Sequence, residues 1–305
     1  ALVILGASLN DNFLSAGNVQ NVLARSAFIG IIAVGMTFVI TAGGIDLSVG
    51  SMAAFTAGVT ILAMNAMVEP LGVSVFTIVL GMGVALLTGL AAGMVNGALV
   101  AHVRIEPFIV TLGAMGLYRS LTTWLADGGT ISLDFELRSL YRPVYHDGPF
   151  GISWPILVFA LVAILGELAM RSAPFGRHCA AIGANEQVAR YSAVRVDRVR
   201  MATYALLGLL VGVATIMYVP RLGSASGSTG VLWELEAIAA VIIGGTVLKG
   251  GFGRVWGAVV GVLILSLIDN ILNLASIVSP YLNGAIQGVI VILAVVLQRE
   301  RKAED

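Results

Sequence analysis

Residues 35–51 read GMTFVITAGGIDLSVGS and join two long hydrophobic segments. Before this junction the chain has no charged residue between Arg25 and Asp46, and after it none from Leu47 to Val68. Each run is near or above the roughly 20 apolar residues with which a helix crosses a bilayer core. The stretch therefore predicts two membrane-spanning helices joined by a glycine-containing turn.

Long uncharged runs continue through the rest of the chain. Of its 305 residues, 58% are hydrophobic and 11% are charged, against roughly 45–50% and 25% in a soluble domain. The charge gaps and the glycine and proline positions predict spans at 1–9, 19–42, 48–67, 72–101, 107–126, 153–170, 199–220, 235–249, 255–273 and 283–298. We therefore expect an all-α polytopic membrane protein of about ten transmembrane helices, of which the N-terminal span is partial.

The distribution of basic residues predicts the orientation of the chain. With the C-terminus in the cytoplasm, twelve Lys and Arg residues lie inside and five lie outside, namely Arg25, Arg119, Arg138, Arg142 and Arg221. This agrees with the excess of positive charge in cytoplasmic loops. Residues 1–305 then form one transmembrane domain with an extracytoplasmic loop at 127–153 and a cytoplasmic loop at 172–200. Pairing spans two to five with spans seven to ten predicts an inverted repeat, although the two halves share no clear residue-level match.

The turn after the second span carries Gly43, Gly44, Asp46 and Ser48. The glycine pair ends the helix because glycine adopts conformations closed to other residues. Asp46 or Ser48 can then cap the next helix. One interpretation is a tight interhelical turn, and the other is a discontinuity that hinges or lines a solute route, as broken helices do in transporters.

Several polar residues lie inside the predicted spans, where polar groups are costly in lipid and normally face the bundle interior or a wet cavity. Interhelical hydrogen bonding is one explanation for them. The other is a path for a hydroxyl-rich solute. The candidates for that path, together with one aromatic residue, are Thr37, Thr41, Asn96, Phe108, Thr111, Asn270 and Asn273.

The cytoplasmic loop contains the segment NEQVARYSAV at 185–194. Ala184, Val188 and Tyr191 follow one another at i, i+4 and i+7, which predicts a short amphipathic helix. Asn185 is placed to cap its first turn. Such a helix fits either a groove in a partner protein or the membrane surface.

The sequence gives no sign of catalysis. It has no HExxH motif and no nucleophile elbow. The glycine-rich stretch GGTVLKGGFGR at 244–254 is not followed by Lys-Ser/Thr, so we expect no nucleotide site there. With one cysteine, three dispersed histidines and zero net charge, we expect no metal site, no cofactor and no nucleic-acid partner.

Four stretches, in the same order along the chain, resemble one known family. GGIDLSVGS at 43–51 resembles the signature of the permeases that import ribose, xylose, arabinose and galactofuranose, within the superfamily of branched-chain amino acid permeases. PFIVTLG at 107–113, AIGAN at 181–185 and EAIAAVIIGG at 236–245 resemble the family's fifth span, cytoplasmic loop and eighth span. Departures at Ala42, Ala193 and Val194 remove no charge, and we expect them to tune packing only.

The resemblance implies a role and a set of partners. The chain would be a non-enzymatic permease in the bacterial inner membrane that carries a sugar by alternating access. It would pair with a second permease, either an identical copy or a paralogue, with two cytoplasmic ATPase domains that bind ATP and Mg, and with an extracytoplasmic sugar-binding protein. The residues implied for coupling to the ATPase are Gly183, Asn185, Glu186, Val188, Arg190 and Tyr191.

Two other transport classes stay open from the sequence. An ion-coupled carrier would depend on an intramembrane carboxylate, for which Asp269 is the best candidate. A branched-chain amino acid permease would need strongly polar groups for a zwitterion, and the spans contain few of them. The sequence does not select one sugar among the solutes that such permeases carry.

Overall fold

The structure is a computed structural model that describes residues 2–275, 282, 285–286 and 288–289. The described chain is mainly helical. The helices are α1 (Leu2–Leu9), α2 (Ala16–Thr41), α3 (Val49–Leu71), α4 (Val75–Ala101), α5 (Pro107–Leu125), α6 (Phe135–Tyr141), α7 (Pro143–His146), the 3-10 helix η1 (Pro149–Gly151), α8 (Trp154–Arg171), α9 (Pro174–Ala184), α10 (Glu186–Tyr191), α11 (Val196–Leu222), α12 (Trp233–Ile243) and α13 (Val255–Ala275). Strands β1 (Thr130–Ser132) and β2 (Ser224–Ser226) pair antiparallel, with Ile131 opposite Ala225.

Six of the described helices, α2, α3, α4, α8, α11 and α13, are long and apolar enough to cross a membrane. The all-helical membrane fold is therefore confirmed, whereas the predicted number of about ten spans is not. The span expected at 235–249 is the 11-residue α12, because the chain turns at Gly244 and Gly245. The span expected at 1–9 is the 8-residue α1. The span expected at 283–298 lies almost entirely outside the described residues.

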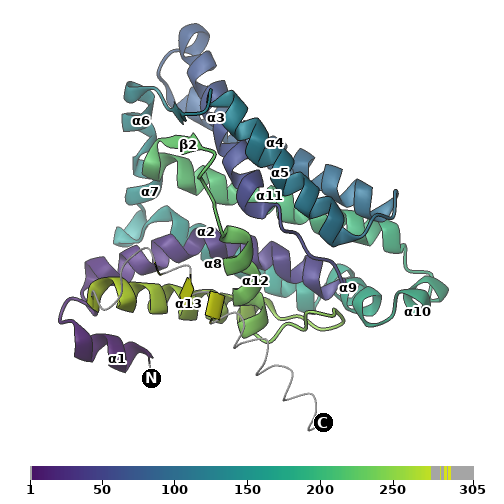
Figure 1. The fold of residues 1–305 in the computed structure, drawn as a ribbon. Coiled ribbons are helices and arrows are strands. Elements are labelled where there is room, and N and C mark those ends of the chain that lie inside the picture. The colour runs from purple at the N-terminus through teal and green to yellow at the C-terminus, as the bar shows by residue number, and fades with distance from the viewer. Residues whose placement is uncertain (1, 276–281, 283–284, 287, 290–305) are drawn as a thin grey trace.

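Helices α2 and α11 form the centre of the molecule. Most of α2 is buried, including Phe38, Ile31 and Ile32, since α8, α11, α12 and α13 pack around it. Figure 1 shows α3, α4 and α5 along one side of the molecule and α2, α8 and α13 along the other. α11 packs against both α4 and α2 and so joins the two sides.

Helices α4 and α11 meet through glycines, in a contact we call the α4–α11 seam: Gly89 and Gly93 on α4, and Gly208 and Gly212 on α11. A Cβ on Gly93 would lie 2.9 Å from the Gly208 Cα and would overlap the Tyr204 carbonyl oxygen. Glycines four residues apart lie on one helix face and let two backbones approach closely. The seam is the most extensive helix contact in the described chain.

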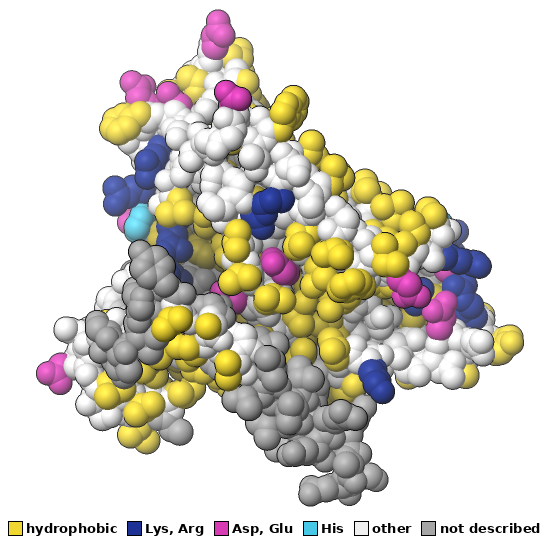
Figure 2. Space-filling view, viewed as in Figure 1, with side chains coloured by type: hydrophobic (Ala, Val, Ile, Leu, Met, Phe, Trp, Pro, Cys, Tyr) yellow, Lys and Arg dark blue, Asp and Glu magenta, His cyan; other side chains and the backbone are white. Residues whose placement is uncertain are grey.

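The bundle has two distinct ends. The arginine end carries Arg25, Arg138, Arg142 and Arg221 near α6 and α7, and the glycine end carries the turns around Gly43, Gly183 and Gly250 near α9 and α10. Figure 1 shows α6 and α7 far from α10, and Figure 2 shows one group of Lys and Arg side chains beside α6 and α7 and another beside α10.

Candidate functional site

The turn between α2 and α3 is fixed by backbone geometry. Gly43 has φ of 78°, a conformation that favours glycine, and its N–H donates to the Ile40 carbonyl at 2.9 Å. The Tyr204 hydroxyl donates to the Ile45 carbonyl at 3.0 Å. A Cβ on Gly44 would lie 2.7 Å from that hydroxyl. Glycine at position 44 thus lets α11 approach the turn.

Asp46 lies at the centre of a fully buried polar cluster. Its carboxylate accepts hydrogen bonds from the Ser48 N–H at 2.7 Å, the Ser48 hydroxyl at 2.6 Å and the Asn96 amide at 3.2 Å. The Asn96 amide oxygen in turn accepts from the Tyr118 hydroxyl at 3.3 Å. The cluster therefore ties the turn to α4 and α5.

The predicted cap of α3 is different in the structure. Ser48 occupies the N-cap position but makes no side-chain cap bond, and the Asp46 carboxylate accepts from the N–H of Ser48 itself. The reason is a set of tertiary contacts. Both side chains are used in the bonds with Asn96, 50 and 48 residues away.

Three turns meet at the glycine end, in a contact we call the glycine junction: Gly43, Gly183, Gly250 and Gly251. A Cβ on Gly183 would overlap the Thr41 carbonyl oxygen, and a Cβ on Gly250 would lie 2.9 Å from the Gly43 nitrogen. The Gly251 N–H donates to the Thr41 carbonyl at 3.0 Å. The loop at 172–200, predicted to be cytoplasmic, therefore rests directly on the turn at 43–48, which we call the signature turn.

Helix α10 follows the junction and presents an apolar face. The Asn185 side chain accepts from the Val188 N–H at 3.1 Å, so the predicted cap is confirmed. Val188 is 57% exposed and Tyr191 is 90% exposed, whereas Ala189 on the opposite face is buried. The predicted helix is confirmed for Val188 and Tyr191, whereas Ala184 is the last residue of α9 and is separated from α10 by the extended Asn185.

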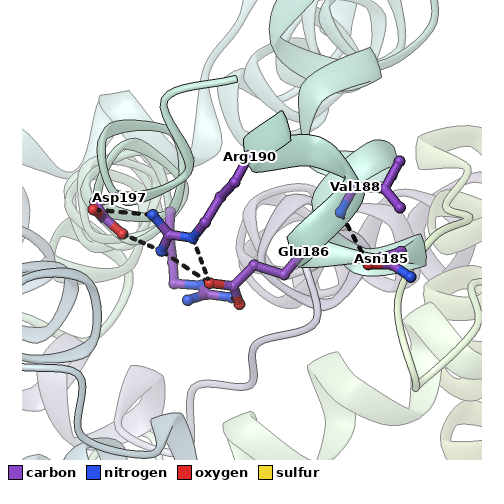
Figure 3. A network of polar contacts seen from close by, with 6 residues as sticks. Asn185, Glu186, Val188, Arg190 and Asp197 are labelled. Atoms are coloured by element: carbon purple, nitrogen blue, oxygen red, sulfur yellow. Dashed lines mark hydrogen bonds and ion pairs between the residues drawn. The ribbon is translucent and has the colours of Figure 1, made fainter. Parts of the chain in front are cut away.

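Ion pairs hold α10 against the start of α11 (Figure 3). Glu186 pairs with Arg190 at 2.9 Å and with Arg200 at 2.8 Å, and Arg190 pairs with Asp197 at 2.7 Å. Exposed pairs contribute roughly 0–1 kcal/mol each, so their main effect is on orientation. The hydrogen bond from Arg200, followed by that from Arg190, holds the pKa of Glu186 below its usual range. The stabilisation that the ionised Glu186 carboxylate gains from these arginines is present at neutral pH and is lost as the pH falls through that lowered pKa.

The candidate path residues do not form one cluster within the subunit. Thr37, Thr41 and Thr111 are buried and donate to carbonyls four residues earlier in their own helices. Phe108 is 54% exposed on α5. Asn270 and Asn273 lie at the arginine end, where they line a cavity of about 1030 Å³. Their role in translocation stays a prediction.

Comparison with known proteins decides the family. Residues 18–295 match the family described as the permease component of the branched-chain amino acid transport system. The chain belongs to this permease family. The ribose import permease RbsC of Bacillus subtilis is 38% identical over 304 residues, which cover 99% of this chain and 91% of that protein. No solved structure matches the chain.

Other relatives of the permease are also named as sugar permeases. The ribose import permease RbsC of Escherichia coli is 36% identical over 99% of this chain and 91% of its own length. The fructose import permease FruG of Bifidobacterium longum is 32% identical over 98% of this chain and 87% of its own length. The resemblance noted in the sequence is thus confirmed, and the permease is a transport component and not an enzyme.

Sequence reasoning missed several residues of these sites. Tyr118 and Tyr204 close the polar cluster and the turn, and Asp197 and Arg200 complete the ion pairs of α10. The permease sequence signals the last two only weakly, by charges just after the amphipathic segment. It gives no signal for the tyrosines, because their partners lie 22 and 159 residues away.

Proposed function

We propose that this permease is the membrane-spanning subunit of an ATP-binding-cassette importer for a sugar or sugar-like solute. Similarity over nearly the whole chain to permeases named for ribose, xylose and fructose supports the substrate class. The arrangement of α9 and α10 supports the link to an ATPase. The permease itself binds no cofactor in this proposal, since ATP and Mg bind the partner ATPase.

In the proposed topology the glycine end faces the cytoplasm of a bacterium and the arginine end faces outward. The concentration of Lys and Arg in the loops next to the glycine end supports this orientation. The 19-residue helix α5 then supplies a further crossing beside the six long apolar helices. Spans two to five and seven to ten form the two inverted halves.

The exposed apolar face of α10 carries the proposal. Val188 and Tyr191 project from a short helix whose ends are fixed by the Asn185 cap and by the ion pairs to Arg200 and Asp197. Large exposed apolar side chains on a fixed element suit a groove in a partner protein. We assign α10 as the coupling helix that docks on the ATPase.

The contacts give a physical route for coupling. Closure of the ATPase pair on ATP displaces α10, and α9 passes the displacement to the glycine junction because Gly183 touches the Thr41 carbonyl. The signature turn moves with it, and the Asp46 cluster transfers the movement to α4 and α5. The outer mouth then opens to a sugar delivered by an extracytoplasmic binding protein. Hydrolysis resets the cavity inward, and differential contact between the two states drives the cycle.

The complete importer contains a second permease, as an identical copy or a paralogue, and two ATPase domains. The scattered positions of the candidate path residues agree with a route that one subunit does not enclose. An ion-coupled carrier with Asp269 as the key carboxylate is the main competing function. A branched-chain amino acid substrate is the other, and the family description supports it.

Changing Val188 and Tyr191 together to aspartate should abolish docking of the ATPase. Two charges would replace two apolar side chains at the centre of the interface, and such anchors are worth about 2 kcal/mol or more each. We expect at least a hundredfold loss of ATPase subunit recovered with the tagged permease from mild detergent, and loss of sugar-stimulated hydrolysis.

Phe150→Asp is the matched control, because Phe150 is also a fully exposed aromatic residue but lies in the 127–153 loop away from α10. We expect it to retain the ATPase. Solute movement by the purified permease alone, in liposomes under an ion gradient without ATP, would contradict the importer and direct attention to Asp269.

A further inference from the structure

The cavity of about 1030 Å³ at the arginine end has no part in the coupling route. It lies between the start of α2, helices α6 and α7, the end of α11 and the outer part of α13. Ligand cavities are typically about 300–1,000 Å³, so it is large enough for a small solute.

Four arginines from different elements converge on this cavity. Arg25 comes from α2, Arg138 from α6, Arg142 from the junction of α6 and α7, and Arg221 from the end of α11. None of the four takes part in the ion pairs of the described chain, which lie within α10 or between α10 and α11. Glu236 and Asp269 also line the cavity and have contacts of their own. The arginines outnumber the carboxylates, so the cavity carries excess positive charge.

Aromatic rings form one wall and support the arginines. The Arg221 guanidinium lies 5.8 Å from the ring centres of both Phe28 and Tyr145, and Trp233 stacks on Phe28 at 6.3 Å. Cation–π contacts hold a guanidinium in place without neutralising it. The arrangement keeps charge available to a ligand, beside an apolar ring surface.

Amide side chains supply neutral hydrogen-bonding groups. Asn18 and Asn270 line the cavity and donate to each other at 3.0 and 2.8 Å, and Asn21 also lines it. Amides both donate and accept, as hydroxyl groups require. Ring faces suit the apolar side of a sugar, and planar guanidinium groups bind carboxylate or phosphate with two parallel bonds.

We propose that this cavity binds a sugar that carries a carboxylate or phosphate group. The proposal rests on the proposed function as a sugar permease and narrows its substrate to an acidic sugar. Arg25 and Arg142 bind the anionic group, and the amides and the Trp233 ring contact the hydroxylated part. A neutral sugar would leave the excess positive charge of the cavity uncompensated.

The test measures binding to the full chain in phosphatidylcholine nanodiscs, by calorimetry and by the fluorescence of Trp233. We expect gluconate or glucose 6-phosphate to bind at least tenfold more tightly than glucose. The double variant R25Q/R142Q should weaken the binding of the acidic sugars at least tenfold and leave the weak glucose binding unchanged. Arg171→Gln, an exposed arginine at the end of α8, is the matched control and should bind as wild type. Trp233→Phe should remove the fluorescence change, because the signal comes from that ring.

Equal binding of glucose and gluconate, or unchanged binding in R25Q/R142Q, would overturn the proposal. Equal binding of inorganic phosphate would reduce the site to an adventitious ion only. Loss of gluconate binding in phosphatidylglycerol nanodiscs would assign the arginines to a lipid headgroup, and tighter binding of leucine would assign them to an amino acid. Each of these results overturns the proposal of an acidic-sugar site but leaves the recovery of the ATPase with the wild-type chain unaffected. Failure of this proposal is therefore distinct from failure of the importer function.

Discussion

The variant Gly93→Ala should lose most of its folded population on mild heating. Its Cβ would overlap the Tyr204 carbonyl oxygen and lie 2.9 Å from the Gly208 Cα, so α4 and α11 must separate. Overpacking of this kind costs about 1–3 kcal/mol, and a backbone neighbour cannot move aside as a side chain can. We expect a clearly lower melting temperature, measured by the monodisperse fraction that remains on size exclusion after heating.

Gly83→Ala is the matched control in the same helix, because nothing lies within 4 Å of the added Cβ. Its melting temperature should equal or exceed that of wild type, since alanine favours helix more than glycine does. If the melting temperature of Gly93→Ala equals that of wild type, the α4–α11 seam has room for a side chain.

The variant Gly183→Ala should fold and dock but transport at least tenfold more slowly. The added Cβ would overlap the Thr41 carbonyl and crowd Gly251, which forces α9 away from the signature turn. The apolar face of α10 is not altered, so the ATPase should still be recovered with the permease. A strain of about 1.4 kcal/mol on one state of the cycle corresponds to a tenfold change in its population.

The measurement is sugar uptake in proteoliposomes with the ATPase and binding protein present. Gly17→Ala, at an exposed helical glycine with nothing within 4 Å, is the control and should transport as wild type. Normal uptake by Gly183→Ala would remove the glycine junction from the coupling route, and loss of the bound ATPase would indicate a defect in docking instead.

The features that sequence reasoning predicted well are those set by near neighbours. Uncharged runs predicted α2, α3, α4, α8, α11 and α13, because crossing a bilayer requires about 20 apolar residues in a row. The Asn185 cap and the exposed face of Val188 and Tyr191 were also correct, since both depend on spacing within one helical turn or two.

The features it missed depend on distant partners. Asp46 or Ser48 was expected to cap α3, but both side chains bond to Asn96, 50 and 48 residues away, in a buried cluster. The length of α12 was overestimated, because hydrophobicity continues past Ile243 while the backbone turns at Gly244 and Gly245. The glycine junction was invisible in the sequence, where Gly43, Gly183 and Gly250 occur in three separate motifs.

The α4–α11 seam also constrains how the subunit moves. α4 lies in the first of the two proposed halves and α11 in the second, and their backbones approach each other closely at Gly89, Gly93, Gly208 and Gly212. Two helices in such contact cannot slide or tilt separately without breaking many van der Waals contacts at once. In the proposed function, the two halves of one subunit therefore move as one rigid body. In the alternating-access cycle that we propose, the displacement that exposes the solute first to one side of the membrane and then to the other would occur at the contact between the two permease subunits.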